Sequence, residues 1–294
     1  MTTSLRSWFY FFAISCFWGS TFFWQKLIFR EIGPFSIVAT RFTIACLFLT
    51  SIMRSQKLSF PRDKKTWGNL AVLCLFYMSL PTFLNSWGVT RVDTNISSIV
   101  NASSPLFVLA STSLIFRDEV LTTQKVLGAL LGFSGILLIM GSNMLDSSIK
   151  YDTWGMIALL ASAMCYSLSP ALARRMLNRQ NAIVQAASLT GIAAVYGWVV
   201  VLLFSSFQLP TQPLSWLGIM WLGLLGSGMA NLFYFDLLKS WGPGHTGMVA
   251  YVVTIVGLIL GTFVLGERIT WPLMIGSVLV MAGVLFANRR TRES

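Results

Sequence analysis

The chain has few charged residues and almost no histidine. Only 11% of its 294 residues are Asp, Glu, Lys or Arg, whereas a typical soluble domain has about a quarter. The sole histidine is His245. A hydrophobic content of 55% and a mean hydropathy of +0.71 accompany this deficit. A large soluble core does not explain such a composition, so the chain is predicted to lie largely in lipid.

Motifs that carry catalysis or bind metals and nucleotides are also missing. The sequence has no HExxH, GxSxG or GxxxxGK[ST] pattern. None of the four cysteines has a ligand spacing, and we interpret them as small packing residues: Cys16, Cys46, Cys74 and Cys165. We therefore expect no enzymatic activity, no catalytic residue, no bound metal, no cofactor and no nucleotide-driven motor.

Ten apolar segments alternate with charged clusters, glycine or proline. Each is close to the 20 or so residues that a transmembrane helix needs. The segments run near residues 7–29, 34–53, 67–89, 94–116, 121–141, 152–174, 181–204, 214–238, 244–265 and 270–288. The first is longer than the apolar core of a signal peptide and lacks a cleavage site, so we expect it to remain in the mature protein. An all-α polytopic membrane protein with ten transmembrane helices is predicted.

The basic residues of the short loops predict the orientation in the membrane. With both termini in the cytoplasm, fifteen Lys and Arg residues fall on the cytoplasmic side and four on the outer side, which is the bias that membrane insertion favours. This distribution accounts for the net charge of +11. We therefore expect the lipid bilayer as a partner and no nucleic acid.

A short block of residues recurs at a distance of 148 residues. Because each copy closes a stretch of five spans, the odd number of crossings predicts that the second copy is inverted, with repeats at 1–145 and 146–294. The glycines of the block offer close helix packing, and they serve equally well as a dimer face, so a monomer and a homodimer are both open. The two copies are Glu119–Thr122 with Gly128 and Gly135, and Glu267–Thr270 with Gly276 and Gly283.

Further short motifs follow one another in a fixed order. They are Trp18-Gly19-Ser20 with Lys26, Ala39-Thr40-Arg41-Phe42, Pro105, Arg117-Asp118-Glu119, and Gly266-Glu267 with Gly276 and Gly283. In this order the chain resembles the drug/metabolite transporter superfamily, in its ten-helix branch built from two EamA repeats. The resemblance covers the whole chain, although the second repeat lacks a proline near Val253. It implies two inverted five-helix repeats around a central cavity, with spans five and ten at the periphery.

Polar and aromatic side chains in the implied cavity helices are candidates for substrate contact. Such groups are expensive in lipid and usually face the protein interior. Amides and hydroxyls would fix the polar ends of a small zwitterionic solute, and rings would pack its apolar part. Packing of the aromatic rings against lipid stays open as an alternative. The candidates are Trp18, Gln25, Tyr77, Asn85, Ser98, Asn101, Tyr166, Ser169, Asn231, Tyr234 and Tyr251.

Four ionisable residues are candidate charge contacts. Lys26 either extends to the membrane surface or binds an anion, and Arg41 either makes a structural hydrogen bond or binds an anion. Asp236 and His245, near helix ends, are able to titrate. The absence of acids near the middle of any span disfavours export of cationic drugs in exchange for protons. Prolines at 81, 105 and 170 are expected to kink their helices.

These features together predict a secondary transporter, an exporter of small organic metabolites such as amino acids, that works by alternating access. A metabolite uptake or exchange permease of the nucleotide-sugar kind and a non-transporting membrane scaffold remain alternatives. The resemblance implies a multi-pass protein of the bacterial inner membrane with a small-molecule substrate.

Overall fold

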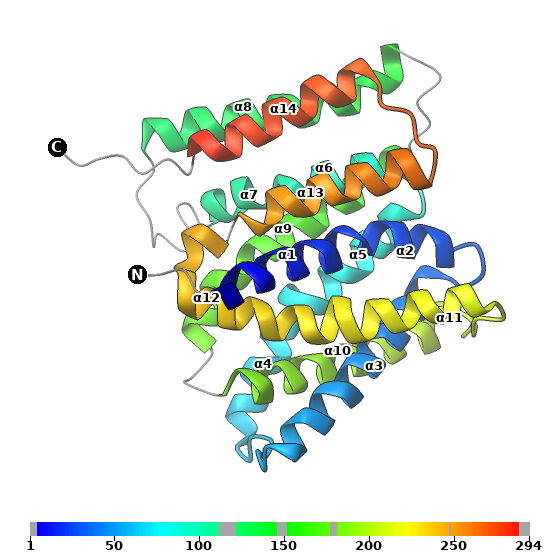
Figure 1. Cartoon of the computed structure of the whole chain (residues 1–294), viewed down its shortest axis with the longest axis vertical. Helices are drawn as coiled ribbons and strands as arrows, with labels where there is room; N and C mark the ends of the chain where they lie inside the picture. Colours follow the sequence, from blue (N-terminus) through cyan, green and yellow to red (C-terminus); the bar gives the residue numbers. More distant parts are fainter. Residues whose placement is uncertain (1–4, 112–121, 146–151, 177–180, 247, 288–294) are drawn as a thin grey trace.

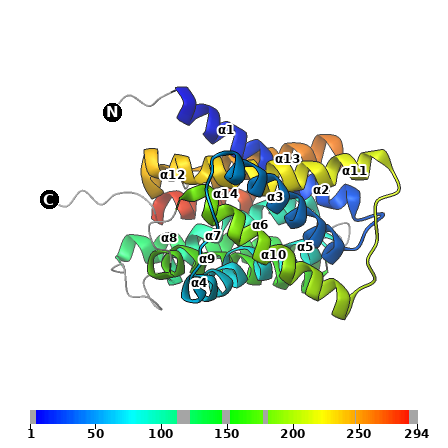
Figure 2. The ribbon, with the colours of Figure 1, turned by 90° about the horizontal axis from the view of Figure 1, so that it is seen from below.

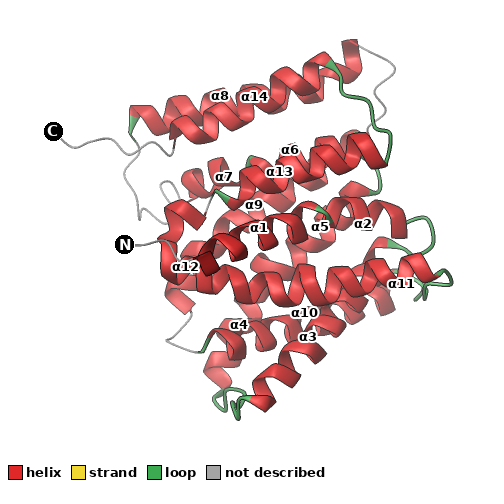
Figure 3. Cartoon of the chain, viewed as in Figure 1, coloured by secondary structure: helices red, strands yellow, loops and turns green. Residues whose placement is uncertain are grey.

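The computed structural model describes residues 5–111, 122–145, 152–176, 181–246 and 248–287 (Figure 1). Every regular element in these ranges is a helix (Figure 3). The all-helical class predicted from the sequence is therefore confirmed.

Local signals set several helix starts in the first half. Pro34 occupies the first turn of its helix, where its missing N–H is not needed, and the Asp63 side chain accepts a hydrogen bond from the Thr66 amide at 2.8 Å. The elements are α1 (Leu5–Gly19), α2 (Thr21–Ile28), α3 (Pro34–Ser55), α4 (Lys64–Cys74), the π-helix η1 (Leu75–Ser79), α5 (Leu80–Val89), α6 (Thr94–Ala102), α7 (Ser104–Ala110) and α8 (Thr123–Leu145).

Side-chain caps also begin two helices of the second half. Asp152 accepts from the Trp154 amide at 3.0 Å, and Asn181 accepts from the Ile183 amide at 2.9 Å. The elements are α9 (Thr153–Met176), α10 (Ala182–Phe204), α11 (Pro213–Met220), the π-helix η3 (Trp221–Met229), α12 (Ala230–Thr246), α13 (Val249–Ile259), the π-helix η4 (Leu260–Val264) and α14 (Trp271–Ala287).

Several helical stretches have the length and composition of membrane spans. Four are long and apolar enough to cross a bilayer: Pro34–Ser55, Lys64–Val89, Ala182–Phe204 and Pro213–Leu237. Four shorter helices are also apolar: Thr123–Ile139, Thr153–Leu168, Val249–Val264 and Trp271–Ala287. These helices are consistent with a membrane protein, and the ten-span topology stays a prediction.

The prolines within the predicted spans differ in effect. Pro81 follows η1 at the start of α5, and Pro105 stands at the start of α7, after an interruption at Ser103. By contrast, α9 passes through Pro170 to Met176 without interruption. A further break separates α1 from α2 at Ser20, which the sequence did not predict.

Glycines bring α8 and α14 into backbone contact at one edge of the bundle (Figure 1). A Cβ atom added at Gly128 would lie 2.6 Å from the Ala287 nitrogen, and one at Gly135 would lie 2.6 Å from the Gly276 carbonyl oxygen. The two helices therefore run antiparallel, and their contact has no room for larger residues. The glycine face that the sequence left open for dimerisation is occupied within the chain.

At the opposite edge, α3 and α10 also run antiparallel. A Cβ added at Gly197 would lie 2.8 Å from the Ala39 Cα, and one at Gly191 would lie 3.3 Å from the Cys46 Sγ. Helices α1, α9 and α13 lie between these two pairs (Figure 1). Figures 1 and 2 show that α1 begins and α14 ends on the same side of the bundle.

Candidate functional site

Polar side chains from three helices converge on the π-helical segment η3 in the interior. Trp18 Nε1 donates to the Gly226 carbonyl oxygen at 3.0 Å. Arg41 Nε donates to Ser227 Oγ at 2.9 Å, and Asn231 Nδ2 donates to the Ser227 carbonyl oxygen at 2.6 Å. Two adjacent residues of η3 thus hold groups from α1, α3 and α12.

Tyr77 extends this network by a hydrogen bond, and Tyr166 and Tyr234 lie near it. The Tyr77 hydroxyl donates to Asn231 Oδ1 at 3.2 Å, and the Tyr166 hydroxyl shares a hydrogen bond with Thr82 Oγ1 at 3.3 Å. The phenol groups of Tyr166 and Tyr234 both lie within electrostatic range of Tyr77. We call the following seven residues the interior polar cluster: Trp18, Arg41, Tyr77, Tyr166, Ser227, Asn231 and Tyr234.

The three non-aromatic members of the cluster are buried, and its aromatic members are partly buried. Arg41, Ser227 and Asn231 are 6%, 2% and 5% exposed, whereas the aromatic members are half-buried. The Trp18 and Tyr234 rings lie 5.3 Å apart between centroids. Such a site offers hydroxyl and amide groups for polar atoms and ring faces for apolar ones.

A second π-helical segment lies at the spacing of the sequence recurrence. At the 148-residue spacing, η1 (Leu75–Ser79) corresponds to residues 223–227 of η3. A π-helical turn inserts one extra residue and shifts the register of the carbonyl groups, and such turns occur frequently at functional sites. Here Gly226 and Ser227 present carbonyl oxygens to Trp18 and Asn231.

The structure brings together six of the sequence-predicted residues and leaves others apart. The cluster contains Trp18, Arg41, Tyr77, Tyr166, Asn231 and Tyr234. Asn85 is buried in α5, Gln25 is buried in α2, and Asn101 is half-buried near the end of α6. The Gln25 Oε1 atom has no hydrogen-bond partner among the described residues. The side chains of Ser169 and His245 lie outside the described residues.

Two of the predicted residues serve helix packing. Ser98 is fully buried where α6 meets α13, and a Cβ added at Gly257 would lie 2.6 Å from its Cβ. Tyr251 packs against an apolar group that contains Leu106, Val284 and Ala287, on the side of the bundle toward α14. Direct contact of any predicted residue with a substrate stays a prediction.

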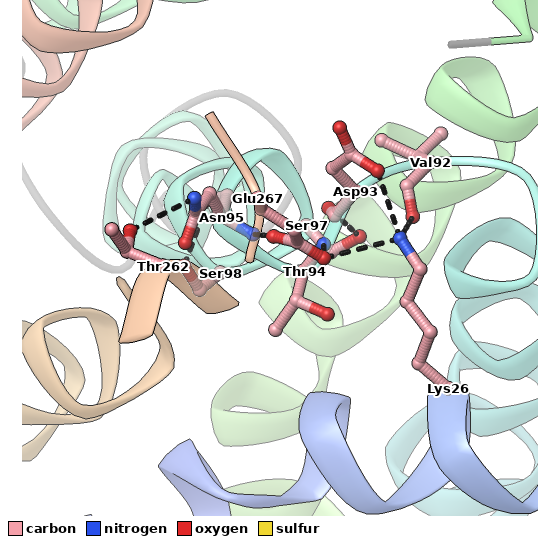
Figure 4. Close-up of polar contacts among 9 residues, drawn as sticks. All are labelled: Lys26, Val92, Asp93, Thr94, Asn95, Ser97, Ser98, Thr262 and Glu267. Carbon is pink, nitrogen blue, oxygen red and sulfur yellow. Dashed lines mark hydrogen bonds and ion pairs between the residues drawn. The ribbon is translucent and has the colours of Figure 1, made fainter. Parts of the chain in front are cut away.

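A second polar group surrounds Lys26 at one end of the helices (Figure 4). Its Nζ atom lies 2.9 Å from Asp93 Oδ1, 3.1 Å from Glu267 Oε1 and 3.3 Å from the Val92 carbonyl oxygen. The sequence left open whether Lys26 extends to the membrane surface or binds an anion. In the structure, its ammonium group is directed to carboxylates within the protein. The lysine thus contacts two carboxylates of the chain.

Glu267 is the central residue of this ion cluster. Its carboxylate accepts hydrogen bonds from the backbone amides of Thr94 and Asn95, both at 2.8 Å, and is 6% exposed. A carboxylate at a helix N-terminus satisfies amides that have no partner within the helix and is favoured by the helix dipole. Glu267 therefore joins α2 and α6 to the segment that precedes α14. The sequence marked Glu267 only as part of the repeat and did not single out Asp93.

Asp236 lies at the other end of the bundle and does not reach the interior polar cluster. It pairs with Arg6 at 3.0 Å, and the two side chains are 46% and 68% exposed. An exposed pair of this kind contributes little to stability. No group of three or more His, Cys, Asp or Glu side chains in the described part of the chain could hold a metal ion.

Comparison with known sequences identifies the family. The profile of the EamA-like transporter family matches residues 6–141 and, a second time, residues 153–289. The chain belongs to the EamA-like transporter family. Membership of this family and its helical, apolar structure agree with a membrane transporter rather than an enzyme.

Relatives that match this chain across nearly its full length are also named as transporters. An "Uncharacterized transporter" of Archaeoglobus fulgidus is 24% identical and covers 93% of this chain and 95% of its own. "Uncharacterized transporter YoaV" of Bacillus subtilis is 23% identical, with 95% of both chains covered. "Uncharacterized inner membrane transporter YedA" of Escherichia coli is 25% identical, with 93% and 88% covered.

A solved structure shares the fold of this chain. A chain titled "Crystal structure of protein" superposes with a TM-score of 0.69 at 19% identity, covering 97% of both chains. At this identity the likeness shows the fold alone.

Proposed function

We propose that this EamA-family protein is a secondary transporter that exports small organic metabolites, with amino acids as the first class to test, by alternating access. The interior polar cluster carries the proposal. It joins a guanidinium, three phenols, an amide and an indole inside a helical bundle, where such groups are expensive unless they bind something polar.

The inverted arrangement of two repeats, at 1–145 and 146–294, is part of the proposal. The contacts between equivalent helices support it. When each residue number is shifted by 148, one contact between α8 and α14 becomes another contact between the same two helices. The contact of Gly128 with the Gly283 region corresponds to that of Gly276 with Gly135. Helices that are equivalent and antiparallel are those expected around a two-fold axis in the membrane plane.

The ion cluster around Glu267 supports alternating access. It holds α2, α6 and the segment before α14 together at one end of the bundle. A transporter that opens alternately to two sides needs contacts that close one end and can be broken again. Charged and hydrogen-bonded groups at the rim suit this role because water can replace each partner when the end opens.

The orientation and location are proposed from charge and relatives. The excess of Lys and Arg in alternate loops supports cytoplasmic termini, and the common side of the α1 start and the α14 end agrees with this orientation. The name of the Escherichia coli relative includes the inner membrane. We therefore propose a multi-pass protein of the bacterial inner membrane.

Transport is tested by counterflow in liposomes reconstituted with the purified protein. Proteoliposomes loaded with one unlabelled amino acid at a time should accumulate the same labelled amino acid for at least one of them, with saturable kinetics. Export is then tested by release of that amino acid from cells that overproduce the protein. The absence of saturable flux for amino acids, organic acids, amines and sugars alike would contradict the proposal.

A matched pair of variants connects the flux to the interior polar cluster. Tyr77→Phe removes the hydroxyl that donates to Asn231. Tyr196→Phe removes a comparable hydrogen bond, from a phenol on α10 to the Ala71 carbonyl oxygen at 3.3 Å, outside the cluster. We expect the first variant to lower flux severalfold and the second to leave it near the wild-type level. Equal effects would argue that the cluster has only a structural role.

A further inference from the structure

Arg41 places a positive charge within the interior polar cluster. The residue is 6% exposed, and its Nε atom is engaged by Ser227 Oγ. Its Nη2 atom lies beside Gly226. A Cβ atom added at Gly226 would lie 3.6 Å from Arg41 Nη2 and 3.7 Å from Thr21 Oγ1. Tyr166 is within electrostatic range of the guanidinium.

This charge has no carboxylate partner among the residues that the structure describes. The ion pairs there involve Arg6, Lys26 and Arg91 as the cations, and none involves Arg41. The neighbours of Arg41 in the cluster are hydroxyls, carbonyls and rings, which are neutral. Lys26, the basic residue of the first predicted span, contacts two acids.

An uncompensated guanidinium inside a membrane bundle is unfavourable unless an anion reaches it. Arg41 has a second reason to face an anion, because its hydrogen bond to Ser227 engages Nε and leaves the end-on pair of Nη1 and Nη2 donors for another partner. These donors match a carboxylate in a two-point geometry that a lysine does not offer.

We propose that Arg41 binds the carboxylate of the transported solute, so that substrates of this protein are carboxylates or zwitterions. This inference rests on the proposed transport function and names its substrate class. The remaining members of the cluster complete the site. Asn231 and the phenols accept or donate to polar atoms of the solute, and the rings of Trp18 and Tyr234 contact its apolar part.

The same arrangement predicts how a solute's amino group is treated. The cluster contains no acid, so an ammonium group meets only amide and phenol oxygens and ring faces, which attract it more weakly than a carboxylate would. Loss of the carboxylate from an amino acid should therefore weaken binding more than loss of the amine. This order is opposite to the one expected for an exporter of cationic amines.

Binding of three matched probes tests the assignment. L-Phenylalanine, 3-phenylpropionate, which lacks the amine, and 2-phenylethylamine, which lacks the carboxylate, are titrated into the full-length protein in detergent by calorimetry. L-Leucine, 4-methylpentanoate and 3-methylbutylamine form a second series with a smaller side chain. In at least one series we expect the amine to bind at least tenfold more weakly than both carboxylates.

The variant Arg41→Gln should abolish this preference, so that the carboxylate and the amine of a series bind within about twofold of each other. Lys26→Gln, which removes the paired cation, should leave the preference unchanged. If Arg41→Gln does not yield a monodisperse protein, Arg41→Lys serves instead, since it keeps the charge without the planar fork. It should weaken carboxylate binding severalfold and leave amine binding unaffected.

Three results would overturn the inference. They are equal or tighter binding of the amines, a carboxylate preference that survives in Arg41→Gln, and no binding of any carboxylate probe. Saturable counterflow of neutral or cationic solutes would then leave the proposed transport function standing without the carboxylate site. The absence of flux for every solute class would count against the transport function itself.

Discussion

Glu267→Gln is expected to destabilise the protein more than any other single change in the ion cluster. The wild-type carboxylate accepts from two backbone amides at the start of α6 and from Lys26, and it is 6% exposed. The glutamine side chain has one acceptor oxygen, so its NH2 group would face one of the amides as a second donor. Hydrogen bonds to charged groups contribute about 1.5–3 kcal/mol each. Loss of one such bond, together with the ion pair, predicts a loss of roughly 2–4 kcal/mol.

Asp93→Asn is the matched control, because it removes the other carboxylate that contacts Lys26. Asp93 is 41% exposed, so water screens its pair with the lysine, and its removal should have an effect of only about 0–1 kcal/mol. Each variant replaces a carboxylate by the corresponding amide. Comparison of the two therefore separates the effect of the buried contact from that of the exposed contact.

Thermal unfolding of the purified variants in one detergent measures the difference. The melting temperature should fall clearly for Glu267→Gln and change little for Asp93→Asn. A double-mutant cycle with Lys26→Met should give a larger coupling for the pair with Glu267 than for the pair with Asp93. An Asp93→Asn variant that is as unstable as Glu267→Gln, or more so, would refute the assignment of Glu267 as the central residue.

Two further predictions concern helix contact and pH. Gly283→Ala should destabilise the protein by at least about 2 kcal/mol, since the added Cβ would lie 2.6 Å from the Gly128 carbonyl oxygen, whereas Gly68→Ala, with open space around it, should stabilise α4 by about 0.5–1 kcal/mol. Equal melting temperatures for these variants would contradict the close contact. The hydroxyls of Ser215 in α11 and Thr211 in the preceding loop, together with the backbone amides of Thr211 and Gln212, lower the pKa of Glu31 below its usual 4.5. The charged form therefore stabilises the fold above that pH, and this stabilisation is lost as the pH falls through the lowered pKa. Glu31→Gln should reduce the loss of melting temperature between pH 7 and pH 3.5, and an unchanged difference would exclude this role.

Helix positions were predictable where local chemistry decides them. The segment predicted at 34–53 is the helix Pro34–Ser55, and the segment predicted at 181–204 is Ala182–Phe204. A proline in the first turn and an asparagine cap are visible in the sequence. The break at Ser20 and the π-helical turns were not predictable, since they leave the apolar composition of a span unchanged and depend on neighbouring helices.

The candidate site was predictable in its residue types and only partly in its geometry. Polar and aromatic residues within apolar segments indicated Tyr77 and Asn231, because few alternatives to an interior position exist for an amide in lipid. The packing positions of Ser98 and Tyr251 depend on which helices are neighbours. Glu267 lies between apolar segments, and its inward direction arises from a contact with Thr94, 173 residues earlier. No periodicity in the sequence reports such a contact.

The contact between α8 and α14 pairs positions that lie 148 residues apart in the sequence recurrence, and under the proposed inverted repeat it corresponds to a symmetric dimer interface enclosed in one polypeptide. In two separate identical chains, every substitution at such an interface would occur twice, and its effect on stability would be doubled. In a single chain each side can change alone. The equivalent positions Gly132 and Val280 show this freedom. A Cβ added at Gly283 would lie 2.7 Å from the Gly132 Cα, whereas the Val280 Cγ2 lies 3.0 Å from the corresponding point at Gly135. Covalent linkage of the two halves therefore lets each half of this interface diversify by single, separately tolerated mutations.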